Sequence, residues 1–73
     1  MQITPAQIRA ARGLVQMSQA QLAANAFMSK SGLGNLEAGL AAPRMSTLKA
    51  IRKALESAGV EFLPEGGLRL RSQ

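Results

Sequence analysis

The chain contains no cysteine, histidine, tryptophan or tyrosine, and its only aromatic residues are two phenylalanines. Without cysteine it has neither disulfides nor thiolate metal ligands, and without histidine it lacks the usual zinc ligand and general base. Its four acidic residues are all glutamates. We therefore expect no enzymatic activity, no metal site and no cofactor.

Long hydrophobic runs are also missing. No apolar run approaches the roughly 18 residues that a membrane-spanning helix needs, and the N-terminus lacks the charge and hydrophobicity order of a signal peptide. We expect a cytoplasmic protein with no membrane partner. A core built from 73 residues supplies only a few kcal/mol, which favours tight helix packing or dimerisation.

Positive charge is present, and it is unevenly distributed. Residues 1–55 contain seven lysines and arginines and one glutamate, whereas residues 56–73 contain two arginines and three glutamates. A basic body with a nearly neutral tail is typical of a phosphate-binding surface joined to a separate pairing element. An ordinary solvated basic surface is the alternative.

A serine or threonine suited to cap a helix precedes each expected helix, at Thr4, Ser18, Ser29 and Ser46. Gln7 and Gln21 complete capping boxes at the first two, because each lies three residues after its cap. Together with apolar residues at three-to-four spacing, the caps predict helices over residues 5–15, 19–25, 30–37 and 47–58. The second and third of these have the layout of a helix-turn-helix.

After Gly59 the hydrophobic period changes to alternation. Residues 60–63 and 68–71 alternate or nearly so around turn-forming residues 64–67, which predicts a short β-hairpin, although a frayed tail is the alternative. The expected fold is all-α: a compact four-helix domain over 1–59, followed by a C-terminal hairpin over 60–73. The hairpin has four apolar residues to pack on the helices or on a second subunit: Val60, Phe62, Leu68 and Leu70.

The third expected helix has one polar face. If it begins at Lys30, its leucines point inward, while Lys30, Ser31, Gly34 and Asn35 lie on the opposite side. Lysine binds guanine, serine binds several base edges and asparagine favours adenine, so this face is a candidate for reading bases in the major groove.

Two glycines in this short helix need an explanation, because each costs roughly 1 kcal/mol relative to alanine. Gly32 and Gly34 let the helix approach the floor of a DNA groove closely, or the segment is a loop and not a helix. The caps and the spacing of Leu33 and Leu36 favour the helix.

The segments SQAQLAANAFMSKSGLGNLEAG and PRMSTLKAIRKALESAGVEF resemble the lambda-repressor-like, or XRE-type, helix-turn-helix family over residues 5–58. The resemblance implies a sequence-specific regulator of transcription that binds double-stranded DNA. The combination of a capped SQxxLA, a spaced Leu-Glu-x-Gly and a following Pro-Arg is moderately specific.

The resemblance also implies individual roles. Lys30 and Ser31 match the family's base-reading positions, and Arg44 matches a loop arginine near the minor groove. Gln19 matches a glutamine that contacts a phosphate and braces the first reader, and we group Ser18 and Ser29, at the starts of two helices, with it as backbone-positioning residues. Arg12 and Glu37 match a buried ion pair.

Phe27 departs from the family pattern, which usually has glycine in the turn between the second and third helices. Because a bulky residue with positive φ is an outlier, we expect the turn to shift, with Asn25 taking the left-handed conformation.

The family's fifth helix is missing as well. We therefore expect a homodimer built on residues 55–71, acting as a repressor on an inverted-repeat operator in the nucleoid. The rival interpretation is a helix-turn-helix module that binds another regulatory protein, as an anti-activator or antitoxin-like protein does.

Overall fold

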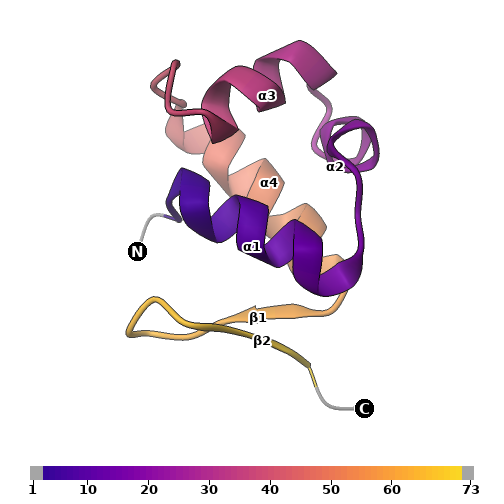
Figure 1. Cartoon of the computed structure of the whole chain (residues 1–73), viewed down its shortest axis with the longest axis vertical. Helices are drawn as coiled ribbons and strands as arrows, with labels where there is room; N and C mark the ends of the chain where they lie inside the picture. The colour runs from indigo at the N-terminus through magenta and orange to yellow at the C-terminus, as the bar shows by residue number, and fades with distance from the viewer. Residues whose placement is uncertain (1–2, 72–73) are drawn as a thin grey trace.

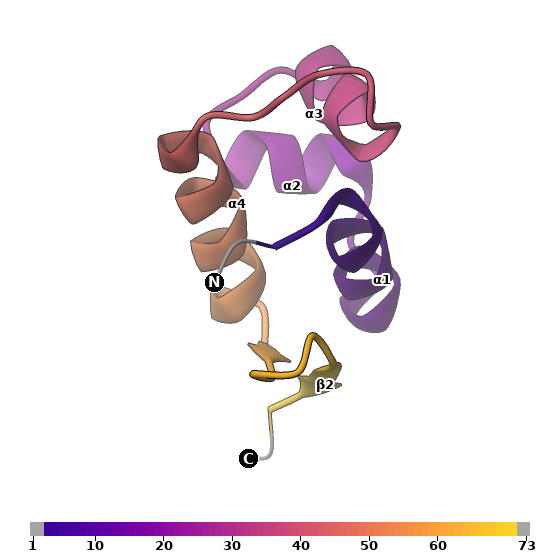
Figure 2. The same ribbon diagram turned by 90° about the vertical axis from the view of Figure 1, so that its left-hand side faces the viewer.

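The computed structural model describes residues 3–71, so the ends of the expected ranges 1–59 and 60–73 lie outside the described residues. Four helices are followed by two strands: α1 (Pro5–Val15), α2 (Gln19–Asn25), α3 (Lys30–Glu37), α4 (Met45–Ser57), β1 (Val60–Phe62) and β2 (Leu68–Leu70). Helix α3 and the hairpin lie at opposite ends of the molecule, with α1, α2 and α4 between them (Figures 1 and 2). The predicted fold class is confirmed.

The first three helices begin at the predicted caps. Thr4 and Ser18 each accept a backbone N–H from the residue three positions on, and the side-chain oxygen of the glutamine there accepts the cap's own backbone N–H, which completes both capping boxes. Ser29 accepts the N–H of Gly32 at 2.9 Å. These bonds satisfy N–H groups that the first turn of a helix leaves without a partner.

The predicted fourth cap is wrong. Helix α4 begins at Met45 with Arg44 as its N-cap, and no side chain makes a capping hydrogen bond there. Ser46 lies within the first turn. The backbone N–H of Leu48 already donates to the carbonyl of Arg44 at 3.0 Å, so the helix starts two residues earlier than its serine indicates.

The core lies where the four helices meet, and the hairpin closes it at the end opposite α3 (Figure 1). Its largest fully buried side chains are Ile8, Leu22, Leu33, Ile51, Leu55 and Val60. Strands β1 and β2 pair antiparallel, with Val60 opposite Leu70 and Phe62 opposite Leu68. Gln7 connects the two ends of the chain: its Oε1 accepts the N–H of Thr4, and its Nε2 donates to the carbonyl of Gly66 at 2.8 Å.

The turn between α2 and α3 contains a strained residue. Phe27 has φ 59°, and its N–H donates to the carbonyl of Ala24 at 3.2 Å, while the N–H of Met28 donates to that of Ala23 at 2.9 Å. This is the Schellman pattern, whose left-handed position usually belongs to glycine. The expectation that Asn25 would take this conformation is wrong, because Asn25 is the last residue of the helix.

Replacing Phe27 with glycine is expected to stabilise the protein by about 1 kcal/mol. Glycine removes the left-handed penalty of roughly 1–2 kcal/mol, and its greater freedom in the unfolded chain offsets part of this gain. The ring loses little packing, since it is 94% exposed. Urea unfolding checks the change, with Phe27→Ala as the control that retains a Cβ. Equal midpoints for the two variants would contradict the strain.

Candidate nucleic-acid interface

Helix α3 presents a polar face to solvent. Lys30, Ser31 and Asn35 are exposed on this face, whereas Leu33 and Leu36 are buried on the other. Gly34, the fourth predicted member of the face, is half-buried and lies beside the amide of Gln19. The helix therefore carries three side chains with hydrogen-bonding groups that a base edge could meet.

The two glycines of α3 have different surroundings. The segment is a regular helix, so the alternative that it is a loop is wrong. A Cβ built on Gly32 would lie 3.0 Å from the Oγ of Ser29, the hydroxyl that caps the helix. A Cβ on Gly34 would make only ordinary contacts, at 3.8 and 3.9 Å from the amide atoms of Gln19. A Cβ at position 32 would therefore lie close to the cap, but Gln7 and Gln21 carry a Cβ at the corresponding position after Thr4 and Ser18, so the cap alone does not require glycine.

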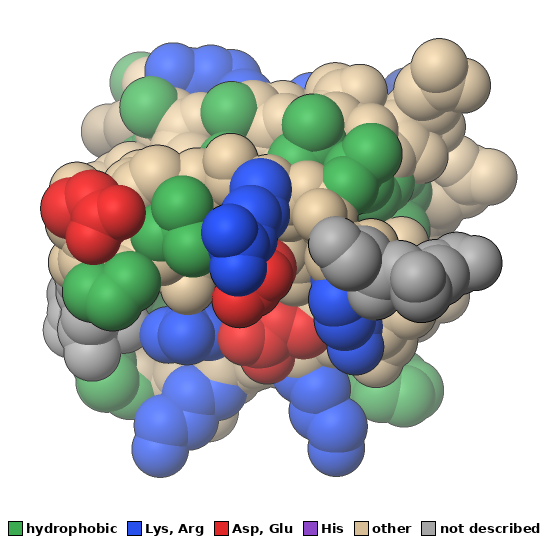
Figure 3. Space-filling view, turned by 90° about the horizontal axis from the view of Figure 1, so that it is seen from below, with side chains coloured by type: hydrophobic (Ala, Val, Ile, Leu, Met, Phe, Trp, Pro, Cys, Tyr) green, Lys and Arg blue, Asp and Glu red, His purple; other side chains and the backbone are tan. Residues whose placement is uncertain are grey.

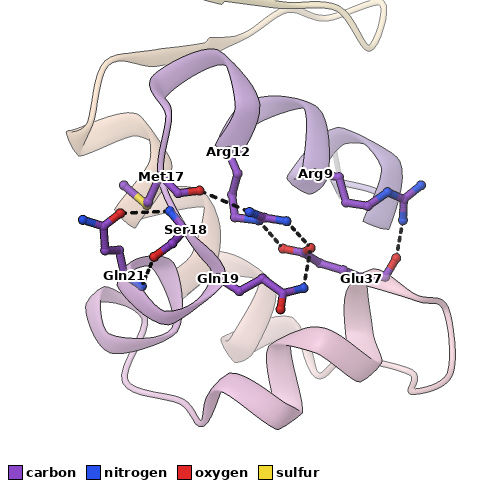
Figure 4. A network of polar contacts seen from close by, with 7 residues as sticks. All are labelled: Arg9, Arg12, Met17, Ser18, Gln19, Gln21 and Glu37. Atoms are coloured by element: carbon purple, nitrogen blue, oxygen red, sulfur yellow. Dashed lines mark hydrogen bonds and ion pairs between the residues drawn. The ribbon is translucent and has the colours of Figure 1, made fainter.

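Behind this face, Glu37 is the centre of a network that joins α1, α2 and α3 (Figure 4). Arg12 binds its carboxylate with two atoms, Nε to Oε2 at 2.7 Å and Nη2 to Oε1 at 2.8 Å. The Nε2 of Gln19 donates to the same Oε1 at 3.1 Å. Glu37 is only 2% exposed, so an acidic side chain is held almost entirely inside the molecule.

The network keeps this buried carboxylate ionised. Burial raises the pKa of Glu37, but the hydrogen bonds from Arg12 and Gln19, together with the charges of Arg12 and Arg9, outweigh burial and hold that pKa below its ordinary value. The hydrogen bond to Glu37 in turn raises the pKa of Arg12. The ion pair therefore fixes the end of α3 relative to α1 over the whole neutral range.

Arg9 also belongs to this network, in a role that is not among those predicted from the sequence. Its Nη1 donates to the backbone carbonyl of Glu37 at the end of α3. Arg9 lies three residues before Arg12, a spacing that places both on one side of α1. That spacing is the signal by which the sequence could have revealed it.

The residues expected to position the DNA backbone lie at helix starts. The Oγ atoms of Ser18 and Ser29 both accept backbone N–H groups, so each hydroxyl retains its own proton to donate to a phosphate oxygen. Gln19 opens α2 with its amide directed to Glu37. Arg44 is exposed at the start of α4, in the loop that follows α3.

The exposed acidic side chains lie at one end of the molecule, away from α3. Glu37 is buried and paired, and the other glutamates, Glu56, Glu61 and Glu65, lie on the last turns of α4 and on the hairpin. Seen from the hairpin end, acidic and basic side chains lie side by side (Figure 3). There Glu61 pairs with Arg69 at 2.8 Å, and this hydrogen bond lowers the pKa of Glu61. The face of α3 therefore carries positive charge without a neighbouring exposed acid.

The hairpin side chains expected at a dimer interface occupy different environments. Val60 and Phe62 are 1% and 9% exposed and belong to the chain's own core, so these two side chains pack on the helices, which is one of the two arrangements expected for them. Leu68 is partly buried against the same core. Leu70 is 53% exposed and is the one of the four that faces solvent.

Two comparisons with known proteins bear on this surface. A family model described as helix-turn-helix matches residues 8–62, more than half of the chain, and these residues include α2, α3 and the Glu37 network. No curated protein matches the chain. Among residues 3–71, no helix has the length and apolar character needed to cross a membrane.

Proposed function

Because the chain belongs to the lambda-repressor-like, XRE-type helix-turn-helix family, a family of DNA-binding proteins, we propose that it is a sequence-specific repressor that reads DNA with α3. The observation that carries the proposal is the exposed, acid-free face of α3 with Lys30, Ser31 and Asn35. The buried network behind it holds that face in a fixed orientation. A rigid helix with polar residues at its start is suited to the major groove.

In this proposal, side chains of the interface have separate tasks. Lys30 and Ser31, at the start of α3, contact base edges, and Asn35 does so one turn later. Ser18, Ser29 and Gln19 bind phosphates at the starts of α2 and α3, with the second N–H of the Gln19 amide serving as donor. Arg44 lies beside the minor groove.

We further infer that the protein binds as a two-fold dimer at the nucleoid. One domain offers only a single reading helix, whereas a dimer presents two, about one DNA turn apart, to an inverted repeat. With Val60 and Phe62 in the core, the hairpin contributes through Leu70 and the outer edge of β2. Repression requires only that the bound dimer cover a promoter. A monomer at micromolar concentration in sedimentation velocity would contradict the dimer.

Selection of bound duplexes from a random pool at physiological salt tests the function. We expect an enriched inverted repeat whose half-sites are roughly 10 base pairs apart, centre to centre. The affinity for that site should fall steeply as salt increases, because bound lysines and arginines release counterions from DNA. An unenriched pool would contradict sequence-specific binding.

Substitutions at Lys30 and Arg44 are expected to differ in kind. Lys30→Ala removes a base contact, so it should weaken binding to the selected site by about 1–3 kcal/mol and relax the sequence preference at one base pair. Arg44→Ala removes a cation that contacts the backbone or the minor groove, so it should weaken binding to all sequences similarly. It should also lower the slope of log affinity against log salt concentration by about one. Parallel binding titrations on selected and scrambled duplexes check this contrast. Identical profiles for the two variants would contradict the assigned tasks.

A further inference from the structure

Phe27 combines two unfavourable features, and although the turn requires the left-handed backbone, it does not require a phenylalanine there. Its backbone is left-handed, with φ 59°, and its ring is 94% exposed to water. Glycine would form the same turn without either cost. Backbone outliers of this kind are concentrated at functional sites, and large exposed apolar side chains mark contact surfaces. DNA binding does not account for the exposed ring, because Phe27 is not among the residues assigned to DNA contacts.

The ring lies at the edge of a groove between the end of α2 and the second half of α4. The groove has a volume of about 420 Å³ and is lined by Asn25, Phe27, Ala50, Lys53, Ala54 and Ser57. Positions 53 and 54 each lie three or four residues from both position 50 and position 57, so the four α4 residues form one stripe along the helix. Alanine and serine are short, which leaves room beside the ring for a side chain from another molecule.

The charge of this groove indicates what it binds. Lys53 lines it, Lys49 is exposed one helical turn earlier, and no acidic residue is among its lining residues within the described part of the chain. Two copies placed groove to groove would bring lysines together in a chain whose net charge is already +5. A head-to-tail contact between copies would not close into a dimer. An acidic partner meets neither obstacle.

We propose that this groove binds an amphipathic helix of another protein, with an apolar side chain against Phe27 and carboxylates facing Lys53. A helix placed in an apolar groove through anchors at helical spacing is a common mode of recognition. The groove shares no residue with the exposed face of α3, so the interaction is separate from DNA reading. It deepens the rival interpretation of the sequence without replacing the DNA-binding role.

The probe for this surface is a displayed library of helix-forming peptides with randomised positions, selected against the full chain. We expect enriched peptides to carry one large apolar residue and several acidic residues spaced by three or four. Phe27→Gly should weaken them about tenfold or more, as for a central aromatic anchor. Lys53→Glu should reverse the preference towards basic peptides. Leu14→Ala, which changes another exposed apolar residue on α1, should have no effect.

Three outcomes would overturn the proposal. Enrichment of peptides without acidic residues contradicts the role of charge. If the peptides bind Phe27→Gly and the unchanged chain equally well, they bind at another surface. Loss of self-association in Phe27→Gly, measured by sedimentation, makes a second copy the occupant. Glycine adopts φ 59° without strain, so loss of binding in this variant cannot be attributed to misfolding. DNA affinity of Phe27→Gly should equal that of the unchanged chain.

Discussion

Glu37→Ala is expected to leave most of the protein unfolded at 25 °C. The substitution removes the charged partner of Arg12 and leaves a guanidinium, whose side chain is 20% exposed, with a hydrogen bond to the carbonyl of Met17 but without a counter-charge. Breaking one side of a buried ion pair costs about 3–5 kcal/mol, which is comparable to the whole stability that a core of this size provides. Circular dichroism with and without a stabilising osmolyte measures the folded fraction.

The matched control changes both partners. Arg12→Met combined with Glu37→Leu replaces the ion pair with apolar side chains of similar size, an exchange that is often neutral or stabilising. This double variant should recover most of the lost stability. If both variants unfold equally, the penalty arises from lost packing and not from an unpaired charge.

Acid should weaken the unchanged chain more than the double variant. The folded-state pKa of Glu37 is lowered, so its stabilising contribution is complete above the ordinary glutamate range and is lost as pH falls through the folded-state pKa, below about pH 4.3. Glu61, whose pKa is also lowered, is common to both chains and cancels in the comparison. Parallel stability profiles of the two chains in acid would contradict this assignment.

Phe62→Ala is the second substitution with a large expected effect, because Phe62 joins the hairpin to the helices. The ring is 9% exposed in the common core, and the guanidinium of Arg52 lies over it, 5.3 Å from its centroid. Truncating a buried phenylalanine costs about 3–5 kcal/mol, so the variant should lose most of its cooperative unfolding transition. Thermal unfolding followed by far-ultraviolet circular dichroism checks the loss.

The control for Phe62 is another apolar residue of the hairpin. Leu70→Ala removes a side chain that is 53% exposed, so its effect on stability, measured at a concentration low enough to keep the chain monomeric, should remain within about 0.5 kcal/mol. Unchanged melting of the helices in Phe62→Ala would show that the hairpin folds as a separate unit.

The helices were predictable because their signals are local. The bounds of α1, α2 and α3 agree with the predicted ranges, since a capping serine or threonine acts within one turn, and in α1 and α2 a glutamine three residues later completes the capping box. Helix α4 shows where a local signal fails. Ser46 is a good cap by type, but the helix already begins at Met45, directly after the extended backbone of Arg44.

Features that depend on tertiary structure were less accessible. Phe27 adopts the left-handed conformation because the end of α2 and the start of α3 determine the length of the turn, and this requirement overrides the residue's own preference. Alternation in the hairpin indicated two faces, but it could not tell whether Val60 and Phe62 face this chain or a partner. Proximity of Arg9 to Glu37 likewise depends on how α1 and α3 pack.

The hydrogen bond from Gln7 to Gly66 also bears on the order in which the protein forms during synthesis. It joins the first turn of α1 to the tip of the hairpin, across 59 positions of the sequence. Synthesis proceeds from the N-terminus at roughly 5–20 residues per second, so α1 leaves the ribosome well before the strand that covers it. Until the hairpin emerges and completes the core, the nascent helices therefore leave apolar surface exposed and accessible to chaperones.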